Sequence, residues 1–358
     1  MKNKMAILMV SILLISLSLI SAGCLDNDFE DKGTRKIIDM AGREVNVPQN
    51  VESIVAVGSG CMRLIAYMEA TDLLAGVEEY EKGDPTGRPY AYANPQLSEH
   101  ESIGPIHGGD MELIADQEPD VIFRASSAEE ADVYQERMGI PTIDLSIGDL
   151  GENKDEFYGS LRLIGDILDK EDRADEIIDY IDSIIQDLQE RSVDIPSEEK
   201  PGVYVGGVLH RGAHDLRSTY SNYAPFEFAN ADNVASDIET DHAMVDEEMI
   251  LEWDPDVVFV DMGSYTRDMI DLNKSVCQEI EAFQNGDLYG VLPYNWHHIN
   301  YGTVLASSFY VGSVLYPEEF SDIDPERKAD EIYEMLVGEP IYGYMERDLE
   351  GGFTKLES

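Results

Sequence analysis

Short apolar runs alternate with amphipathic segments along most of the chain. Uninterrupted apolar runs predict buried strands, and apolar residues that recur with a period near 3.6 predict helices. In the first half, the predicted strands are 53–57, 74–77, 121–123 and 141–145, and the predicted helices are 62–68, 111–115 and 128–138. An alternating segment around Ala41-Gly42 predicts a hairpin ahead of them. Strands that alternate with helices indicate a parallel sheet with helices on both faces.

One amphipathic segment is much longer than the others. Its isoleucines and leucines keep the helical period over residues 173–191, which would span about 28 Å at about 1.5 Å per residue. The segment ends at Asp194-Ile195-Pro196, and a second alternating region begins with a predicted strand at 203–205. The predicted fold class is therefore α/β: two Rossmann-like lobes with parallel-rich sheets, one long rigid helix between them, and a ligand cleft where the lobes face each other.

The first residues have the order of a secretory signal. Lys2 and Lys4 precede an apolar run at 5–20, and the small residues Ser21-Ala22-Gly23 come directly before Cys24. A cysteine in this place indicates a lipoprotein, in which Cys24 becomes the lipid-modified N-terminus at the extracytoplasmic face of the cell membrane. A plain transmembrane anchor is the alternative, because the apolar run is nearly long enough to cross a bilayer.

These observations divide the chain into six predicted parts. They are a lipoprotein signal peptide (1–23), an acidic tether (24–34), a first α/β lobe (35–149), a helical connection (150–199), a second α/β lobe (200–336) and a C-terminal tail (337–358).

The charge of the chain is extreme. It has 25 Lys and Arg against 73 Asp and Glu, a formal net charge of -48. Such a surface argues against nucleic acid and anionic membrane surfaces as partners. Two interpretations stay open: adaptation to high salt, as in halophilic proteins, and a surface that collects cations.

The cysteines suggest no metal centre. Besides Cys24, the chain has Cys61 and Cys277, and none of the three forms a CxxC motif. Two buried thiols and one disulfide are both compatible with this spacing.

The most informative pattern is an internal repeat. Glu112 and Glu248 are each followed, seven residues later, by Pro-Asp-Val and a predicted strand. A histidine precedes each glutamate, His107 in one unit and His242 in the other. The shared spacing predicts that the two lobes arose by duplication and carry the same unit at the same place.

Four segments of the chain resemble the periplasmic binding proteins of ABC importers for ferric siderophores, haem and cobalamin. They are residues 38–45 (IDMAGREV), the two Glu…Pro-Asp-Val units, and residues 292–320 (LPYNWHHINYGTVLASSFYVGSVLYPEEF). The first and last are similar to the archaeal and bacterial iron-complex branch. The resemblance runs from about residue 34 to about residue 336.

This resemblance implies a function and partners. The chain would capture an iron complex, such as a ferric siderophore, and deliver it to an ABC permease dimer with its ATPase subunits. Glu112 and Glu248 would dock onto the permease, since each lobe of the family presents a glutamate to one permease subunit. No cofactor and no resident metal are expected, because the ferric complex is the cargo.

The cleft residues are expected in loops at the ends of strands. The expected ligand-binding residues in the first lobe are Arg63, Tyr80, Arg88, Tyr90 and His107, and those in the second lobe are His210, Arg211, His214, His242, Tyr265, Asn295, Trp296 and His297.

The residue types suit an anionic chelate. Arginine binds carboxylates and phosphates through two parallel hydrogen bonds, and His and Tyr can ligate ferric iron or bond the oxygens of a chelate. His297 and His298 are adjacent and diverge on any regular backbone, so we expect one of them to face the ligand.

Three alternatives remain at this point. Cobalamin or haem would be carried by the same type of importer, although His107 and His242 stand where cobalamin-binding relatives have stacking aromatic residues. A ligand-binding sensor component is the second. A lipid-anchored metallohydrolase is the third, but the chain has no HExxH, GxSxG, P-loop or dinucleotide fingerprint, and we predict no enzyme.

Overall fold

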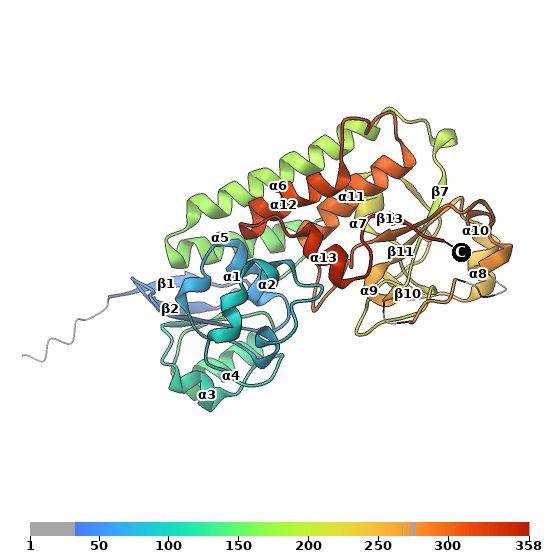
Figure 1. Ribbon diagram of the computed structural model, residues 1–358. Helices are drawn as coiled ribbons and strands as arrows, with labels where there is room; N and C mark the ends of the chain where they lie inside the picture. The colour runs from blue at the N-terminus through green and yellow to red at the C-terminus, as the bar shows by residue number, and fades with distance from the viewer. Residues whose placement is uncertain (1–32, 267, 273, 275–276, 358) are drawn as a thin grey trace, which may run out of the picture. The chain divides into compact units, whose positions relative to one another are not determined.

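The computed structural model describes residues 33–266, 268–272, 274 and 277–357 (Figure 1). The predicted signal peptide, most of the tether and Cys24 lie outside these residues. Residues Thr34–Ser358 form one compact unit. Within this unit, two separate central sheets confirm the predicted two-lobed α/β fold.

The first lobe is built on a four-stranded parallel sheet in the order β4-β3-β5-β6. Nearly all of its strand residues are buried, as expected for continuous apolar runs covered on both faces. The strands are β3 (Ile54–Val57), β4 (Leu74–Gly76), β5 (Val121–Arg124) and β6 (Thr142–Asp144), and the helices are α1 (Cys61–Tyr67), α2 (Pro89–Ala93), α3 (Met111–Asp116) and α4 (Ala128–Met138).

The predicted hairpin precedes this sheet. Its strands β1 (Thr34–Ile38) and β2 (Glu44–Pro48) pair antiparallel. Asp39 and Arg43, at the turn, fasten it to the lobe: Asp39 accepts from the N–H of Asp144, and Arg43 donates to the carbonyl of Thr142.

Two antiparallel helices, α5 (Lys154–Leu168) and α6 (Glu171–Ser192), form the connection between the lobes. The predicted long helix is confirmed as α6, whose apolar stripe is buried along its whole length. At its start, Arg173 donates to the carbonyl of Tyr67 in the first lobe, and at its end, the carbonyl of Ser192 accepts from Asn230 in the second. The helix is thus fixed to both lobes.

The second lobe is built on a sheet in the order β13-β12-β11-β7-β9, in which only β13 runs antiparallel to its neighbour. A separate antiparallel pair, β8 with β10, lies beside it. The strands are β7 (Gly202–Gly206), β8 (Ser218–Tyr220), β9 (Asp232–Asn233), β10 (His242–Met244), β11 (Val257–Asp261), β12 (Leu288–Val291) and β13 (Thr354–Lys355), and the helices are α7 (Ala224–Phe228), α8 (Glu247–Trp253), α9 (Met262–Tyr265) and α10 (Glu281–Asn285).

Three C-terminal helices complete the unit: α11 (Tyr301–Leu315), α12 (Pro325–Val337) and α13 (Tyr342–Asp348). The helix α11 is buried almost throughout and packs against α12, α7 and α6, whereas α12 reaches back to α1 and α2 of the first lobe (Figure 1). The described residues 337–357, expected as a tail, instead contain α13 and the edge strand β13, which joins the second sheet.

Single 3-10 turns connect several of these elements. They are η1 (Thr71–Leu73), η2 (Glu79–Lys82), η3 (Pro95–Glu99), η4 (Ser197–Glu199) and η5 (Cys277–Glu279).

The internal repeat is visible in the hydrogen bonds. In the first lobe, Asp120 donates its N–H to the carbonyl of Ser53 at 2.9 Å and accepts the N–H of Ser53 through its carboxylate at 3.1 Å. In the second lobe, Asp256 makes the same two bonds to Gly202, at 2.8 and 2.7 Å. Each aspartate therefore fixes the start of a central strand, and the repeated Pro-Asp-Val units hold equivalent places.

Candidate functional site

A cleft of about 960 Å³ lies between the two lobes, a size typical of ligand pockets. Most of its lining comes from loops that follow the carboxyl ends of parallel strands, where α/β folds commonly bind ligands. The lining residues are Ser59, His107, Leu209, His210, Arg211, Gly212, Ala213, Tyr220, Asn295, Trp296, His297 and His298.

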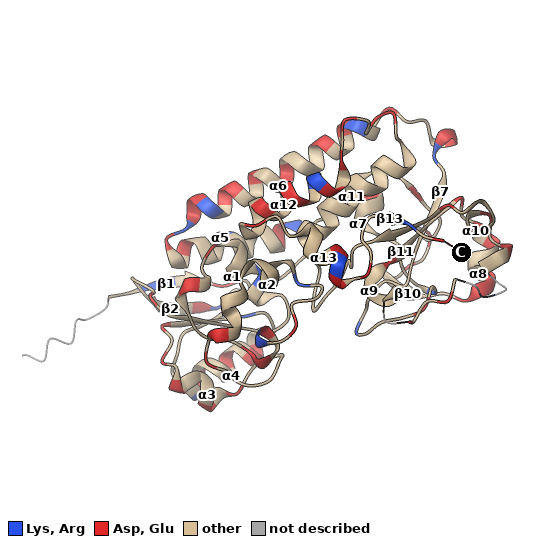
Figure 2. Cartoon of the chain, in the orientation of Figure 1, with Lys and Arg blue, Asp and Glu red and all other residues tan. Residues whose placement is uncertain are grey.

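The lining is chemically unusual for this chain. Figure 2 shows Asp and Glu spread over both lobes, and the sequence has 73 of them. Among the residues that the structure describes, none of the cleft-lining side chains is an Asp or Glu, whereas four are His and one is Arg211. The lining therefore offers hydrogen-bond donors and one full positive charge in a protein that is otherwise strongly acidic.

The first-lobe wall carries His107 and Ser59, joined by a hydrogen bond of 2.9 Å between Nδ1 and Oγ. Below them lies the buried carboxylate of Glu78, which accepts from the N–H of Gly108 at 2.6 Å and from the N–H of Gly58 at 3.4 Å. Burial raises the pKa of Glu78, although these hydrogen bonds oppose the rise. One side chain thus ties together the two loops that present Ser59 and His107.

The second-lobe wall is a group of rings around His210 and His242. Their imidazoles stack at a centroid distance of 3.9 Å and an angle of 7°. Asn295 donates to the hydroxyl of Tyr220 at 3.1 Å, and that hydroxyl shares a hydrogen bond of 3.0 Å with Nδ1 of His210. If the hydroxyl donates in this bond, Nε2 of neutral His210 carries the proton and can donate to a ligand.

His242 and His214 support this wall from behind. The Oγ of Ser218 donates to the carbonyl of Val208, so Nε2 of His242 donates to Ser218 at 2.9 Å. His214 donates from Nε2 to the carbonyl of His210 at 2.7 Å. His214 therefore holds the loop that carries His210, and His242 packs against the ring of His210, which lines the cleft.

The floor is formed by Trp296, His297 and His298, in the loop between β12 and α11. The indole Nε1 of Trp296 donates to the hydroxyl of Tyr80 at 3.0 Å, and the ring of His297 lies 4.1 Å from that of Tyr80. His297 also lies 5.8 Å from His107 on the opposite wall. His297 and His298 have positive φ values of 51° and 105°, a conformation that is rare for residues other than glycine.

Three histidines at the cleft, His210, His242 and His298, have a lowered pKa. Burial, and then the neighbouring charges of Arg211 and His214, lower the pKa of His210. Burial, and then His210 and His214, lower the pKa of His242 to about 4. The side chain of His298 is accessible to solvent but lies within the cleft, against its floor. Partial desolvation there, and then the charge of Arg63, lower its pKa to about 4.

The described histidines do not converge into a metal centre. No three His, Cys, Asp or Glu side chains among the described residues are placed to hold one ion. The histidines can instead donate hydrogen bonds to a ligand, or ligate a metal that arrives within the cargo.

Six of the thirteen expected ligand-binding residues line the cleft: His107, His210, Arg211, Asn295, Trp296 and His297. Three more, Tyr80, His214 and His242, contact lining residues without being part of the lining. The remaining four are placed elsewhere: Arg63, Arg88 and Tyr90 are buried, and Tyr265 lies at the end of α9.

The three buried residues lie in the first lobe. Arg88 pairs with Glu81 at 2.7 Å and lies over the ring of Tyr80, and Tyr90 donates to the same carboxylate. Tyr220, by contrast, lines the cleft although no sequence motif singled it out. Its only signal is its position on a short strand between His214 and His242.

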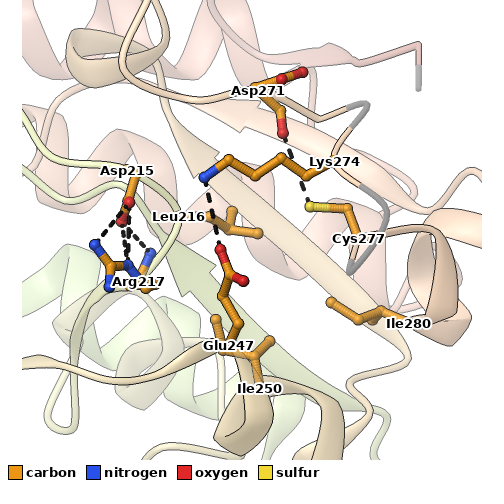
Figure 3. Close-up of a pocket in the computed structure, with 9 residues that line it drawn as sticks. All are labelled: Asp215, Leu216, Arg217, Glu247, Ile250, Asp271, Lys274, Cys277 and Ile280. Carbon is orange, nitrogen blue, oxygen red and sulfur yellow. Dashed lines mark hydrogen bonds and ion pairs between the residues drawn. The ribbon is translucent and has the colours of Figure 1, made fainter.

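A second, much smaller cavity lies in the second lobe, beside α8 (Figure 3). Its volume of about 20 Å³ has room for about one water molecule. Lys274 reaches Glu247 there at 3.6 Å. It is lined by Asp215, Leu216, Arg217, Glu247, Ile250, Asp271, Lys274, Cys277 and Ile280.

The expected docking residues and cysteines are also placed. Glu112 and Glu248 are each the second residue of a helix, α3 and α8, and are exposed outside the cleft. Cys61 and Cys277 are buried free thiols, so they form no disulfide with each other.

The family described as "Periplasmic binding protein" matches residues 54–293. The chain belongs to the periplasmic binding protein family. The match confirms the resemblance seen in the sequence: the chain is a solute-binding protein of an ABC importer and not an enzyme. Binding proteins of this type are extracytoplasmic and work with a permease and its ATPase.

Among curated proteins, the chain is 23% identical to the molybdate-binding protein MolA of Haemophilus influenzae, over 92% of this chain and 96% of MolA. The structure of MolA bound to molybdate is similar with a TM-score of 0.67 and 21% identity, covering 86% of this chain and 98% of MolA.

Two further solved structures are similar. CeuE of Helicobacter pylori, in a nickel–histidine complex, has a TM-score of 0.62 and 17% identity, covering 87% of this chain and 99% of CeuE. The petrobactin-binding protein YclQ of Bacillus subtilis has a TM-score of 0.59 and 18% identity, covering 81% of this chain and 99% of YclQ.

A search for membrane-crossing helices found none among the described residues, where no helix is both long and apolar enough.

The low pKa values of the cleft histidines predict a pH dependence of stability. Between about pH 6.5, the ordinary value for histidine, and about pH 4, the unfolded chain binds more protons than the folded one at His242 and His298. Stability should therefore fall as pH falls through this window, by less than about 1.4 kcal/mol per pH unit for His242, the limit for one proton. The contribution of His298 should be smaller, because its side chain is exposed and solvent screens it.

Thermal unfolding between pH 7 and pH 4 would measure this effect. His242→Gln and His298→Gln should each flatten the slope relative to wild type, while His100→Gln, away from the cleft, should keep it. Equal slopes in all four proteins would contradict the lowered pKa of His242 and His298.

Proposed function

We propose that this binding protein captures an anionic metal complex, a ferric chelate such as a ferric siderophore, and delivers it to its permease. The observation that carries the proposal is the absence of Asp and Glu from the described cleft lining, in a chain with 73 acidic residues. A carboxylate in the lining would repel an anion, whereas Arg211 and the N–H groups of histidines can attract one.

The size of the cleft supports a chelate. A volume of about 960 Å³ lies at the upper end of the range for small-molecule pockets and accommodates a ligand far larger than a four-oxygen anion. The rings of His107, His297 and Trp296 add polarisable surface that suits the organic part of a chelator. The similarity to a petrobactin-binding protein agrees with this class of cargo.

Molybdate is the second candidate. A curated relative of this chain is named as a molybdate-binding protein, and its molybdate-bound structure has the same fold. A set of neutral donors can also surround a small oxyanion, since the N–H groups of imidazoles and of backbone turns can both present partial positive charge to an anion. The two candidates share one chemistry, an anion that contains a metal.

Arg211 offers a direct test. Calorimetry should detect binding of at least one ligand from a panel of ferric citrate, a ferric hydroxamate, a ferric catecholate, molybdate, haem and cobalamin. Arg211→Met should weaken that binding more than about tenfold, because it removes a charge that the ligand would neutralise. Arg217→Met, six residues away and outside the cleft lining, is the matched control.

The panel separates the candidates. Binding of ferric chelates supports the first, and binding of molybdate without them supports the second. Binding of cobalamin alone, or an Arg211→Met variant with wild-type affinity, would contradict an anionic metal complex held by this cleft.

We also propose that Glu112 and Glu248 dock the two lobes onto the permease. Each is the second residue of a short helix after an aspartate, and each is followed by an exposed apolar residue, Leu113 at 42% and Met249 at 40% exposure. Equal placement in the two repeats suits a permease dimer, in which each subunit would receive one carboxylate.

The double variant Glu112→Ala with Glu248→Ala should impair transport into proteoliposomes severely while ligand affinity stays within about twofold, since rim charges act mainly on association. Glu129→Ala with Glu318→Ala, two exposed glutamates elsewhere on the lobes, is the control pair. A large loss of ligand affinity in the first variant would instead connect these glutamates to the cleft.

The lipid anchor on Cys24 stays a proposal, supported by the order of charged, apolar and small residues before it. Intact-mass measurement of protein from native membranes should give a chain that begins at Cys24 with the added mass of a lipid. A retained leader, or an unmodified N-terminus elsewhere, would show that this prediction is wrong.

A further inference from the structure

The loop that forms the cleft floor follows a strand of the second lobe but is fastened to the first. Trp296 donates to the hydroxyl of Tyr80, and Asn300 donates from Nδ2 to the carbonyl of Gly87 at 3.2 Å. Gly87 has φ of 75°, and a Cβ on it would lie 2.0 Å from the indole of Trp296. Only glycine allows this approach, so the indole is seated against the first lobe.

Arg63, on α1 of the first lobe, lies beneath this loop. Its side chain is buried, with 2% exposure, and its Nη2 donates to the carbonyl of Trp296 at 3.1 Å and to Oδ1 of Asn300 at 2.7 Å. The carbonyl of His298 accepts from the N–H of Trp296 at 2.9 Å, so the bond from Arg63 reaches the turn that carries both floor histidines.

The charge of Arg63 has no ion-pair partner among the described residues. Its two acceptors are neutral, its Nη1 is buried without a hydrogen-bond partner in the described part of the chain, and the ring of Tyr90 lies 5.6 Å from its Cζ. The nearby carboxylate of Glu81 pairs with Arg88 instead, at 2.7 Å. A buried cation without a carboxylate is costly, and its field extends to groups farther away.

The charge of Arg63 acts on His298 at the floor of the cleft. The charge of Arg63 helps to lower the pKa of His298, and the charge of Asp149 opposes it. The other titratable groups that line the cleft are His107, His210, Arg211, Tyr220 and His297. An anion in the cleft would meet the positive field of Arg63 from below without touching its side chain.

We propose that Arg63 is a positioning residue for the cleft: it holds the loop that carries His297 and His298 against the first lobe and keeps its unpaired charge below them for an anionic ligand. The second part rests on the proposed function, and the first does not. Arg63 thus acts through the floor, in contrast to the direct ligand contact expected from the sequence.

Two variants separate position from charge. Arg63→Met removes both the hydrogen bonds and the charge. Asn300→Asp keeps an acceptor for Arg63 and places a carboxylate beside it, which offsets its charge. It also loses the bonds from Nδ2 of Asn300 to the carbonyls of Gly87 and Pro293, so its matched control is Asn300→Leu, which loses the same bonds without adding a charge. Arg162→Met, an exposed arginine on α5, is the control.

Two measurements need no ligand. In a Trp253→Phe background, Trp296 is the single tryptophan of the chain, and Arg63→Met should shift its emission to the red as the loop loosens. Titration of the histidines by NMR should show the pKa of His298 rising in both Arg63→Met and Asn300→Asp. If neither the emission nor the titration of His298 changes, the proposal is wrong, whatever the cargo proves to be.

The third measurement uses molybdate and ferric citrate as probes in calorimetry. Whichever of the two probes binds to wild type should bind to both variants about tenfold more weakly. This is the effect expected for losing the attraction between two unit charges about 10 Å apart at an effective dielectric constant of about 20. Unlike Arg211→Met, Asn300→Asp should lose affinity without losing the direct contact of Arg211.

If Arg63→Met proves unstable in thermal unfolding, Asn300→Asp carries the test alone. Wild-type affinity in Asn300→Asp would overturn the role of the charge, and an unchanged pKa of His298 would overturn it independently of any probe.

Discussion

The helix α6 is the constraint on which the cleft depends. With 22 residues it is about 33 Å long at about 1.5 Å per residue, and its two ends are fixed to different lobes. At the first end, Arg173 and Lys170 donate to backbone carbonyls of the first lobe; at the other, Arg191 forms an ion pair with Asp322 and Ser192 accepts from the second lobe. A helix held in this way resists bending, since its hydrogen bonds would have to break for the lobes to hinge freely. The cleft walls are therefore kept at a nearly constant separation, and ligand specificity rests on loops that are already in place.

Those loops are held by polar residues from beneath. In the first lobe, Glu78 ties the segment of Ser59 to the segment of His107. In the second, Asp261 accepts from the N–H groups of Gly263 and Tyr294 and so connects the end of β11 to the segment before the floor. Each lobe thus uses one buried carboxylate to organise two cleft loops, while keeping its negative charge out of the described lining. The same residue type that would repel an anion at the surface of the cleft stabilises the backbone below it.

Much of the fold followed from the periodicity of the sequence. The strands of the first lobe, the hairpin and α6 were predicted within a few residues, because continuous apolar runs and a regular stripe leave few alternatives. The elements in residues 337–357 were not predicted, since α13 and β13 are short and depend on distant parts of the chain, as in the pairing of β13 with Tyr289 and Gly290 of β12.

The site was predicted less completely, for physical reasons. The cleft histidines were found because they follow strands. Arg63 and Arg88 were assigned to the cleft because basic residues are rare, but their guanidinium groups are buried against carbonyls, a carboxylate and tyrosine rings. Tyr220 was missed because its place depends on the antiparallel pairing of β8 with β10, which brings it opposite His242. Such contacts depend on register and tertiary packing, which a single sequence does not reveal.

The position of β13 in the sheet has a consequence for the order in which the chain can fold. All four strands of the first sheet lie between residues 54 and 144, so that sheet can close before the later parts of the chain have folded. The second sheet ends on Thr354–Lys355, and α12 must return to cover α1 and α2. Thr354 and Lys355 thus cap the open edge of β12, an edge that would otherwise be free to pair with other chains. The first sheet can form from one short stretch of the sequence, whereas the second needs strands that lie as far apart as residues 202 and 355.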